Sequence, residues 1–202
     1  TVFYTLFLCQ NREAASVSAQ FGGMNYLIPD DYTATLQEAD INALGVLDPT
    51  IAGPAEQLAL AEISRELSSF ELGSALTLWQ NYDAGISYTV GSRVLLDGTS
   101  LIYALQDAPP GTDPADPTYW AAGDNRPKEL VEVVLRLTVF HLAGRLGIGP
   151  VPAAIADRAR DVRAWLQAQA RGLSPSLFPR QSDKAPFQYG GSPARMDGRS
   201  IW

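Results

Sequence analysis

The pattern of the sequence changes abruptly in its middle, and this change constrains the fold more than any other feature. Apolar residues from Leu60 to Phe70 recur at spacings of three and four, which places them on one face of a helix. Residues 79–126 lack this periodicity and are rich in Tyr, Trp, Gly, Pro and β-branched residues. Within them, Asp97-Gly98 separates two apolar stretches, which is a strong signal for a β-hairpin. The sequence therefore predicts an inserted β minidomain between helical segments.

Three longer helices are expected, over residues 53–72, 127–147 and 152–171. Each has a proline in its first turn and ends at or just before a glycine. Asn125 or Asp124 can cap the second of these helices by accepting hydrogen bonds from backbone amides. The short Gly-Ile-Gly-Pro-Val connection makes the last two helices antiparallel neighbours. The expected fold class is mainly α: a small helical bundle with an inserted small β minidomain and an extended C-terminal arm.

These patterns divide the chain into four parts. Residues 1–23 are expected to form a retained N-terminal extension. A signal peptide has basic residues before its apolar run, and this segment has none there. Residues 24–78 and 127–172 are expected to form the helical body, and residues 79–126 the minidomain. Residues 173–202 have no periodicity and are rich in Pro and Gly, so we expect an extended arm.

The charge of the chain is unevenly distributed. Its 15 Lys and Arg residues stand against 22 Asp and Glu residues, which gives a net charge of −7. The arm, counted from Arg171, is net positive, so the rest of the chain is more acidic than the total. Basic residues and singly spaced apolar residues in the arm suit anchor pockets on a partner protein. The candidate docking residues are Phe178, Arg180, Phe187, Tyr189, Arg195, Arg199, Ile201 and Trp202.

The composition excludes several classes of functional site. A single cysteine, Cys9, and a single histidine, His141, exclude an internal disulfide framework, a cysteine-based zinc site and a site built from two histidines. The sequence has no glycine-rich phosphate loop and no apolar stretch of about 20 residues that could span a membrane. A net charge of −7 opposes tight binding to nucleic acid phosphates. We therefore expect a protein that is not an enzyme, with no catalytic, cofactor-binding or metal-binding residues.

The minidomain contains a series of aromatic residues that includes Trp79, Tyr88, Tyr103 and Trp120. Their order, with the intervening glycines and prolines, resembles that of the small chitin- and cellulose-binding modules and of related short β modules in phage proteins. In those modules, exposed aromatic rings stack on sugars, which makes these four residues candidates for sugar stacking. A minidomain this small also needs aromatic residues for its own core, and the sequence favours this second role.

Three helical segments together resemble a family of Mu-like phage virion proteins. The segment MNYLIPDDY (24–32) is similar to the family's opening, and AEQLALAEISRELSSF (55–70) to its second, Ala-rich helix. Residues 130–172 resemble the family's helix pair, in which the second helix ends in Trp-Leu and a glycine. The likeness covers residues 24–73 and 127–172. The chain departs from the family in its first 23 residues and in the insert.

This resemblance implies a structural protein of the virion, a head-tail adaptor that is also called a connector or head-completion protein. Such proteins form a ring under the portal, commonly twelve-fold, and DNA passes through the lumen without sequence-specific binding. The implied partners are the portal protein, adjacent neck and tail proteins, and other copies of the chain; the implied location is the neck of the virion, and the host cytoplasm during assembly. Two alternatives remain open: another neck component, such as a head-closure or tail-completion protein, and a carbohydrate-binding decoration module.

Overall fold

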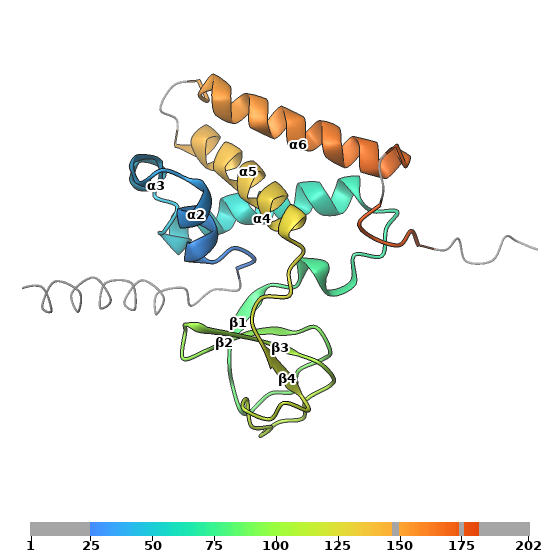
Figure 1. Ribbon diagram of the computed structural model, residues 1–202. Helices are drawn as coiled ribbons and strands as arrows, with labels where there is room; N and C mark the ends of the chain where they lie inside the picture. The colour runs from blue at the N-terminus through green and yellow to red at the C-terminus, as the bar shows by residue number, and fades with distance from the viewer. Residues whose placement is uncertain (1–24, 147–149, 174–175, 182–202) are drawn as a thin grey trace, which may run out of the picture.

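The structure is a computed structural model that describes residues 25–146, 150–173 and 176–181 (Figure 1). The expected extension over 1–23 and the arm beyond Gln181 lie outside these residues. The helical body contains α2 (Pro29–Thr35), α3 (Glu38–Leu44), α4 (Pro49–Glu66), α5 (Lys128–Arg145) and α6 (Ala153–Arg171). The minidomain contains β1 (Trp79–Asn81), β2 (Arg93–Leu96), β3 (Ser100–Ala104) and β4 (Trp120–Ala122), and a 3₁₀ turn over Gly73–Leu76 leads into it.

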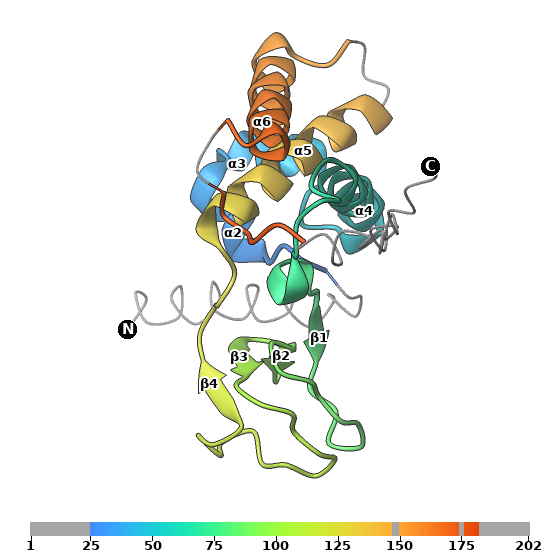
Figure 2. The same ribbon diagram turned by 90° about the vertical axis from the view of Figure 1, so that its right-hand side faces the viewer.

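Helix α5 lies at the centre of the helical body. It packs against α4 and α6, and the short helices α2 and α3 also contact it (Figures 1 and 2). Leu130, Val134 and Leu137 of α5 are fully buried in this core, together with Ile63 of α4 and Leu166 of α6. The core therefore joins segments from both sides of the insert.

Helix α4 begins earlier than its sequence pattern predicts. The expected start was at Gly53-Pro54, but the helix begins at Pro49, after Asp48. The carboxylate of Asp48 accepts a hydrogen bond from the backbone amide of Thr50 at 2.9 Å, which caps the helix. Pro54 consequently lies inside the helix, where it cannot donate a backbone hydrogen bond.

The minidomain is a four-stranded mixed sheet with the order β1-β2-β3-β4. Strand β1 is parallel to β2, whereas the β2–β3 and β3–β4 pairs are antiparallel. The predicted hairpin connects β2 and β3, where Asp97 and Gly98 both have positive φ angles, of 53° and 71°. Two such residues form the turn whose twist matches that of the strands, which explains the Asp-Gly pair.

The expected fold class, mainly α, is wrong. The described residues form five α-helices and a four-stranded sheet, and the sheet has a hydrophobic core of its own, separate from the helical core. The core of the sheet is formed by Tyr88, Val94, Ile102, Ala104, Ala108 and Trp120. The minidomain is therefore a second folded unit with its own core, and the protein combines α and β structure.

Two aliphatic residues of α4 test which face of this helix stabilises the body. Ile63 is fully buried, whereas Leu58 is 49% exposed. We expect Ile63→Ala to lower the free energy of unfolding by about 2–5 kcal/mol, because it leaves a cavity in the core. Leu58→Ala, the matched control, should change it by less than about 0.5 kcal/mol. Urea unfolding followed by circular dichroism measures both, and equal losses would contradict the assignment of the buried face.

Candidate functional site

The first part of the C-terminal arm packs against its own helical body. The ring of Phe178 joins the helical core beside Phe70 and Trp165. The guanidinium of Arg180 lies 5.5 Å from the centre of the Phe70 ring, and its Nη2 donates to the carbonyl of Ala170 at 3.4 Å. These two candidate docking residues therefore make contacts within the chain. The other six, Phe187, Tyr189, Arg195, Arg199, Ile201 and Trp202, lie outside the described residues.

Backbone hydrogen bonds fix the same segment. The amide of Glu71 donates to the carbonyl of Pro179 at 2.8 Å, and the amide of Gln181 donates to Ser69 at 2.9 Å. The turn that brings the chain back occurs at Gly172, where φ is +72° and a Cβ atom would lie 2.6 Å from Nη2 of Arg180. The positive φ angle favours glycine, and a Cβ there would also require the end of the Arg180 side chain to shift. The segment up to Gln181 is thus held against the helical body.

Three of the four candidate sugar-stacking residues are buried. Trp79, Tyr88 and Trp120 are 1%, 3% and 4% exposed, and only Tyr103 is half-buried. The rings of Tyr88 and Trp120 pack edge to face at 5.2 Å, and Tyr82 packs against both of them. The buried rings hold the minidomain together, which is the core role favoured by the sequence. They offer no exposed face on which a sugar could stack.

A buried arginine, Arg126, connects the helical body to the end of the minidomain. Its side chain is fully buried. Nη1 donates to the carbonyl of Tyr26 at 2.6 Å and to Asp31 at 2.8 Å, while Nη2 donates to Asp124 at 2.7 Å. The guanidinium also lies 5.5 Å from the centre of the Trp79 ring. Burial by itself lowers the pKa of Arg126, but the hydrogen bonds to Asp124 and Asp31 outweigh it and raise this pKa.

A second buried arginine, Arg93 of β2, strengthens the same junction. Its Nε donates to Asn125 at 2.7 Å, and its Nη1 donates to the carbonyls of Thr77 at 2.6 Å and Ala75 at 3.3 Å. Asp124 and Asn125, which the sequence assigns as caps of α5, therefore bind the two arginines instead. Helix α5 begins after Pro127 without a side-chain cap.

Sequence reasoning missed both arginines. Arg93 is the first residue of an otherwise apolar strand, and this position next to Val94-Leu95-Leu96 is the signal that could have suggested a buried residue with partners.

Glu56 is a buried carboxylate beside this junction. It is 3% exposed and accepts hydrogen bonds from the backbone amides of Tyr26 and Leu27. Burial raises the pKa of Glu56 to about 7, although the two amides and nearby Arg126 act in the opposite direction. The Glu56 side chain is therefore close to its pKa at neutral pH and becomes largely protonated as the pH falls below about 7.

A second ionic cluster joins the three long helices. Glu62 of α4 accepts hydrogen bonds from Nε and Nη2 of Arg163 of α6 at 2.6 Å and 3.1 Å. Its Oε2 also lies 3.2 Å from Nε2 of His141 of α5, the only histidine of the chain. The hydrogen bond from Arg163 is the main cause that lowers the pKa of Glu62. The cluster holds the helices in register, and His141 has a structural partner in it.

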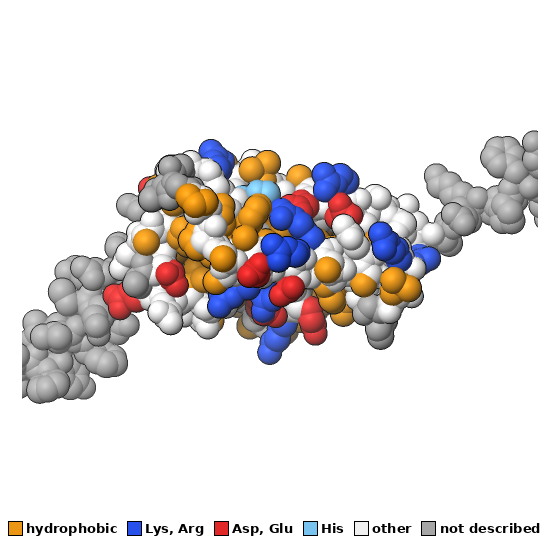
Figure 3. Space-filling model, turned by 90° about the horizontal axis from the view of Figure 1, so that it is seen from above, with side chains coloured by type: hydrophobic (Ala, Val, Ile, Leu, Met, Phe, Trp, Pro, Cys, Tyr) orange, Lys and Arg blue, Asp and Glu red, His pale blue; other side chains and the backbone are white. Residues whose placement is uncertain are grey.

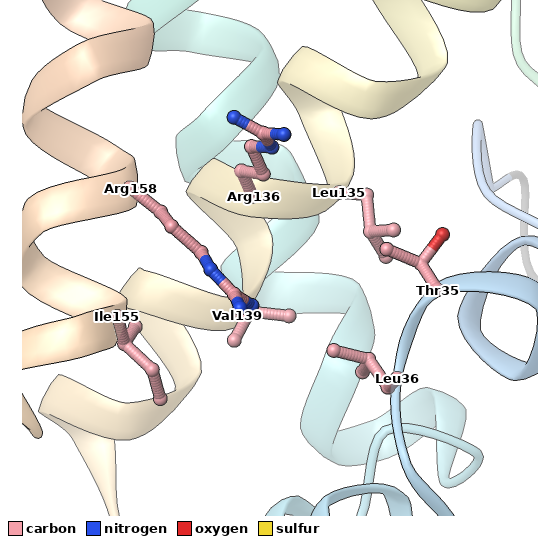
Figure 4. A pocket seen from close by; sticks show the side chains of 7 residues that line it. All are labelled: Thr35, Leu36, Leu135, Arg136, Val139, Ile155 and Arg158. Atoms are coloured by element: carbon pink, nitrogen blue, oxygen red, sulfur yellow. The ribbon is translucent and has the colours of Figure 1, made fainter.

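An open hollow lies between the end of α2, the middle of α5 and the start of α6 (Figure 4). It has a volume of about 240 Å³. Aliphatic side chains form most of its wall, and the side chains of two arginines lie among them. The lining residues are Thr35, Leu36, Leu135, Arg136, Val139, Ile155 and Arg158. Because the hollow is apolar and open at the surface, it is a candidate contact site for a side chain of another protein.

Comparisons with known proteins find no matching family model, no matching curated protein and no matching solved structure. No relative therefore assigns a role to these residues. Within residues 25–146, 150–173 and 176–181, no three or more His, Cys, Asp or Glu side chains form a group that could hold a metal ion. No helix in the described part is long and apolar enough to cross a membrane.

Substitution of Arg126 tests the junction. We expect Arg126→Ala to lower the free energy of unfolding by about 3–5 kcal/mol, because it leaves Asp31 and Asp124 without their buried partner. Arg126→Lys should lower the free energy of unfolding by less than Arg126→Ala does, since an ammonium keeps the charge but cannot make the forked hydrogen bonds. Urea unfolding measures both variants. Arg136→Ala, which breaks an exposed pair with Glu132, is the control and should change stability by about 0.5 kcal/mol or less. Equal effects of Arg126→Ala and Arg136→Ala would refute the role of the junction.

Glu56 should make the stability of the protein depend on pH. Because the folded pKa of Glu56 is raised, the folded state binds this proton more tightly than the unfolded state does. The resulting stability is fully present below the unfolded pKa and is lost as the pH rises through about 7. The loss between about pH 5 and pH 8 should be about 3 kcal/mol.

Glu56→Gln removes this titration, so the difference in unfolding free energy between wild type and variant should change across that pH range. Glu62 and Asp124, whose pKa values are lowered, lose their contribution only at more acidic pH. Glu132→Gln, at an exposed carboxylate, is the control and should follow the wild type. A constant difference between wild type and Glu56→Gln would show that Glu56 does not titrate in this range.

Proposed function

We propose that the protein is a structural component of a phage virion, a head-tail adaptor that forms a ring under the portal and lets DNA pass through its lumen. The observation that carries this proposal is the common core of the two segments that resemble the Mu-like virion proteins. Those segments, residues 24–73 and 127–172, are separated in the sequence by the whole insert.

The described residues of the two segments pack into one hydrophobic cluster. Tyr26, Ile63 and Phe70 come from the first segment, and Leu130 and Leu166 from the second. The minidomain has a separate cluster formed only by its own residues. A resemblance that covers one folding unit and skips an independent insert is what a shared ancestral body with an added module would produce, which supports the proposal.

The charge of the chain also fits a conduit for DNA. Its net charge is −7, so a ring of several copies is strongly acidic. A like-charged lumen repels the phosphates and lets DNA slide through it. The junction of Arg93 and Arg126 fixes the minidomain to one end of the helical body (Figure 2). We propose that the minidomain faces away from the lumen.

The arm supplies the contact with the portal in this proposal. Because Phe178 and Arg180 bind the chain's own body, the docking role is proposed for residues 182–202, which follow the segment held against the body. This segment contains three Lys or Arg residues and two Asp residues and ends in Ile201-Trp202. Buried aromatic and arginine side chains commonly dominate binding at interfaces.

The two alternatives differ in how well the structure supports them. A carbohydrate-binding decoration is disfavoured, because Trp79, Tyr88 and Trp120 are buried. Another neck component, such as a head-closure or tail-completion protein, would use the same helical body and arm, so the structure does not favour the adaptor over it. The experiment below separates an adaptor from another neck component by the partner protein that the chain binds.

Truncation after Gln181 tests the proposal. The chain should be monomeric or weakly associated alone and should bind in several copies to the portal ring encoded in the same genome, as native mass spectrometry measures. The truncated chain should keep its helical circular dichroism signal and fail to bind. Truncation after Gly172 is unsuitable because it also removes the contacts of Phe178 and Arg180 with the body.

A single substitution refines the same experiment. Trp202→Ala should weaken portal binding by roughly 1–3 kcal/mol if the ring is a buried anchor, and Ser200→Ala is the matched control. Normal binding of the truncated chain would show that the arm is not the docking element. Binding to a tail-completion or head-closure protein, with none to the portal, would favour another level of the neck. A stable dimer without affinity for any of these proteins would overturn the virion proposal.

A further inference from the structure

Acidic and basic residues are segregated within the helical body. Between residues 25 and 64 the sequence has seven Asp and Glu residues and no Lys or Arg. Four of these carboxylates are exposed on α2, α3 and the start of α4: Asp30, Glu38, Asp40 and Asp48. Helix α6, in contrast, carries four Arg residues and two Asp residues. The total charge of −7 therefore combines an acidic α2–α4 stretch of the sequence with a net positive α6.

Helix α4 carries an exposed apolar ridge. Ile51 and Leu58 of α4 are 36% and 49% exposed, and the seven-residue spacing places them on one face of the helix, two turns apart. Ala55, Ala59 and Ile63 face the core instead and are fully buried. We call Ile51 and Leu58 the α4 ridge. Asp48, at the N-cap of α4, stands next to the start of this ridge.

The hollow of Figure 4 opens on the other side of α5. Leu135 and Val139 line it, whereas His141 contacts Glu62 of α4 and Leu137 is buried in the core. At about 100° per residue, positions 135 and 139 lie opposite positions 137 and 141 on the helix. The hollow therefore faces away from α4. Figure 3 shows hydrophobic side chains gathered on the face that carries α6, with Lys and Arg side chains beside them and Asp and Glu side chains among these.

The charge at the hollow is complementary to that at the ridge. Arg158 lines the hollow, is exposed, and makes no ion pair with any described residue. Arg136, also at the hollow, is paired only with Glu132 of its own helix in the part of the chain that the structure describes. The hollow thus has an apolar wall with two arginines, and the ridge is apolar with the Asp48 carboxylate next to its start.

We infer that the α4 ridge of one copy of the chain docks into the α2–α5–α6 hollow of the next copy. Because the two surfaces differ and lie on opposite sides of one molecule, the contact is heterologous: copies associate head to tail and form a ring if the rotation closes. Opposite charges at the two surfaces select this orientation over a symmetric one. The contact itself requires only a second copy; the closing of the ring rests on the proposed adaptor function.

Cysteine cross-linking tests this contact even where association is weak. In a Cys9→Ser background, which removes the only cysteine, we introduce Leu58→Cys at the ridge and Thr35→Cys at the rim of the hollow. Each single variant should stay monomeric after mild oxidation. A mixture of the two should give one covalent heterodimer, and the double variant should give a ladder of multimers. These products are resolved by non-reducing gel electrophoresis.

Charge variants show whether the contact is specific. Arg158→Glu in the Thr35→Cys chain should lower the heterodimer yield at least about tenfold. Arg171→Glu makes the same charge change at the far end of α6 and is the matched control, so it should leave the yield nearly unchanged. Since the surfaces are oppositely charged, the yield should also fall as salt concentration rises.

The outcomes separate this contact from the proposed function. Homodimers of Leu58→Cys alone would show a symmetric α4 contact, and absence of the heterodimer would show that the two surfaces do not meet; either result overturns the inference. An equal loss with Arg158→Glu and Arg171→Glu would show a non-specific charge effect and also overturn it. Portal binding is measured separately, so normal portal binding without the cross-link rejects this interface and leaves the adaptor proposal standing.

Discussion

The fully buried guanidinium of Arg126 is the interaction on which the arrangement of the protein depends. It binds the carbonyl of Tyr26 and the carboxylates of Asp31 and Asp124, and it lies against the ring of Trp79. These groups come from the start of the helical body, the first strand of the minidomain and the segment before α5. A buried charge is tolerated only when its partners are all in place, so the three segments must assemble together. The insert is therefore bound firmly to the body, although each has its own hydrophobic core.

The sequence predicts those elements that local chemistry determines. The Asp97-Gly98 turn requires two positive φ angles, and Gly172 provides the left-handed end of α6, so both are visible from a few neighbouring residues. The bond between Arg126 and Asp31 spans 95 residues, and no local pattern announces it. Strands β1 and β4 have three residues each, too few for a period to appear, so the sequence located the β minidomain without showing a four-stranded sheet. The fold was expected to be mainly α because this minidomain was treated as a small insert in a helical bundle.

The site residues show a similar limit. Singly spaced aromatic and basic residues indicate a segment that docks, but they do not specify the surface on which it docks. Phe178 and Arg180 dock on their own body because Gly172 turns the chain back toward Phe70 and Trp165. The sequence identifies both residues as anchors, and both do make contacts. It does not show which surface they contact, because that depends on where α4 and α6 end in space. The same limit applies to Asp124 and Asn125. Their local pattern is that of helix caps, but in the folded chain they bind Arg126 and Arg93.

The segregation of charge explains how copies with the same net charge could associate. Twelve uniformly acidic bodies in a ring would repel one another at every contact, and this repulsion would weaken as salt is added. In the inferred contact, Asp48 beside the α4 ridge of one copy approaches Arg158 at the hollow of the next, so the charges within a Debye length of the contact attract instead. The remaining negative charge can then face the lumen without opposing assembly. In the proposed ring, net charge and local charge would thus have separate consequences: the first would act on the DNA, and the second would determine which faces of neighbouring copies meet.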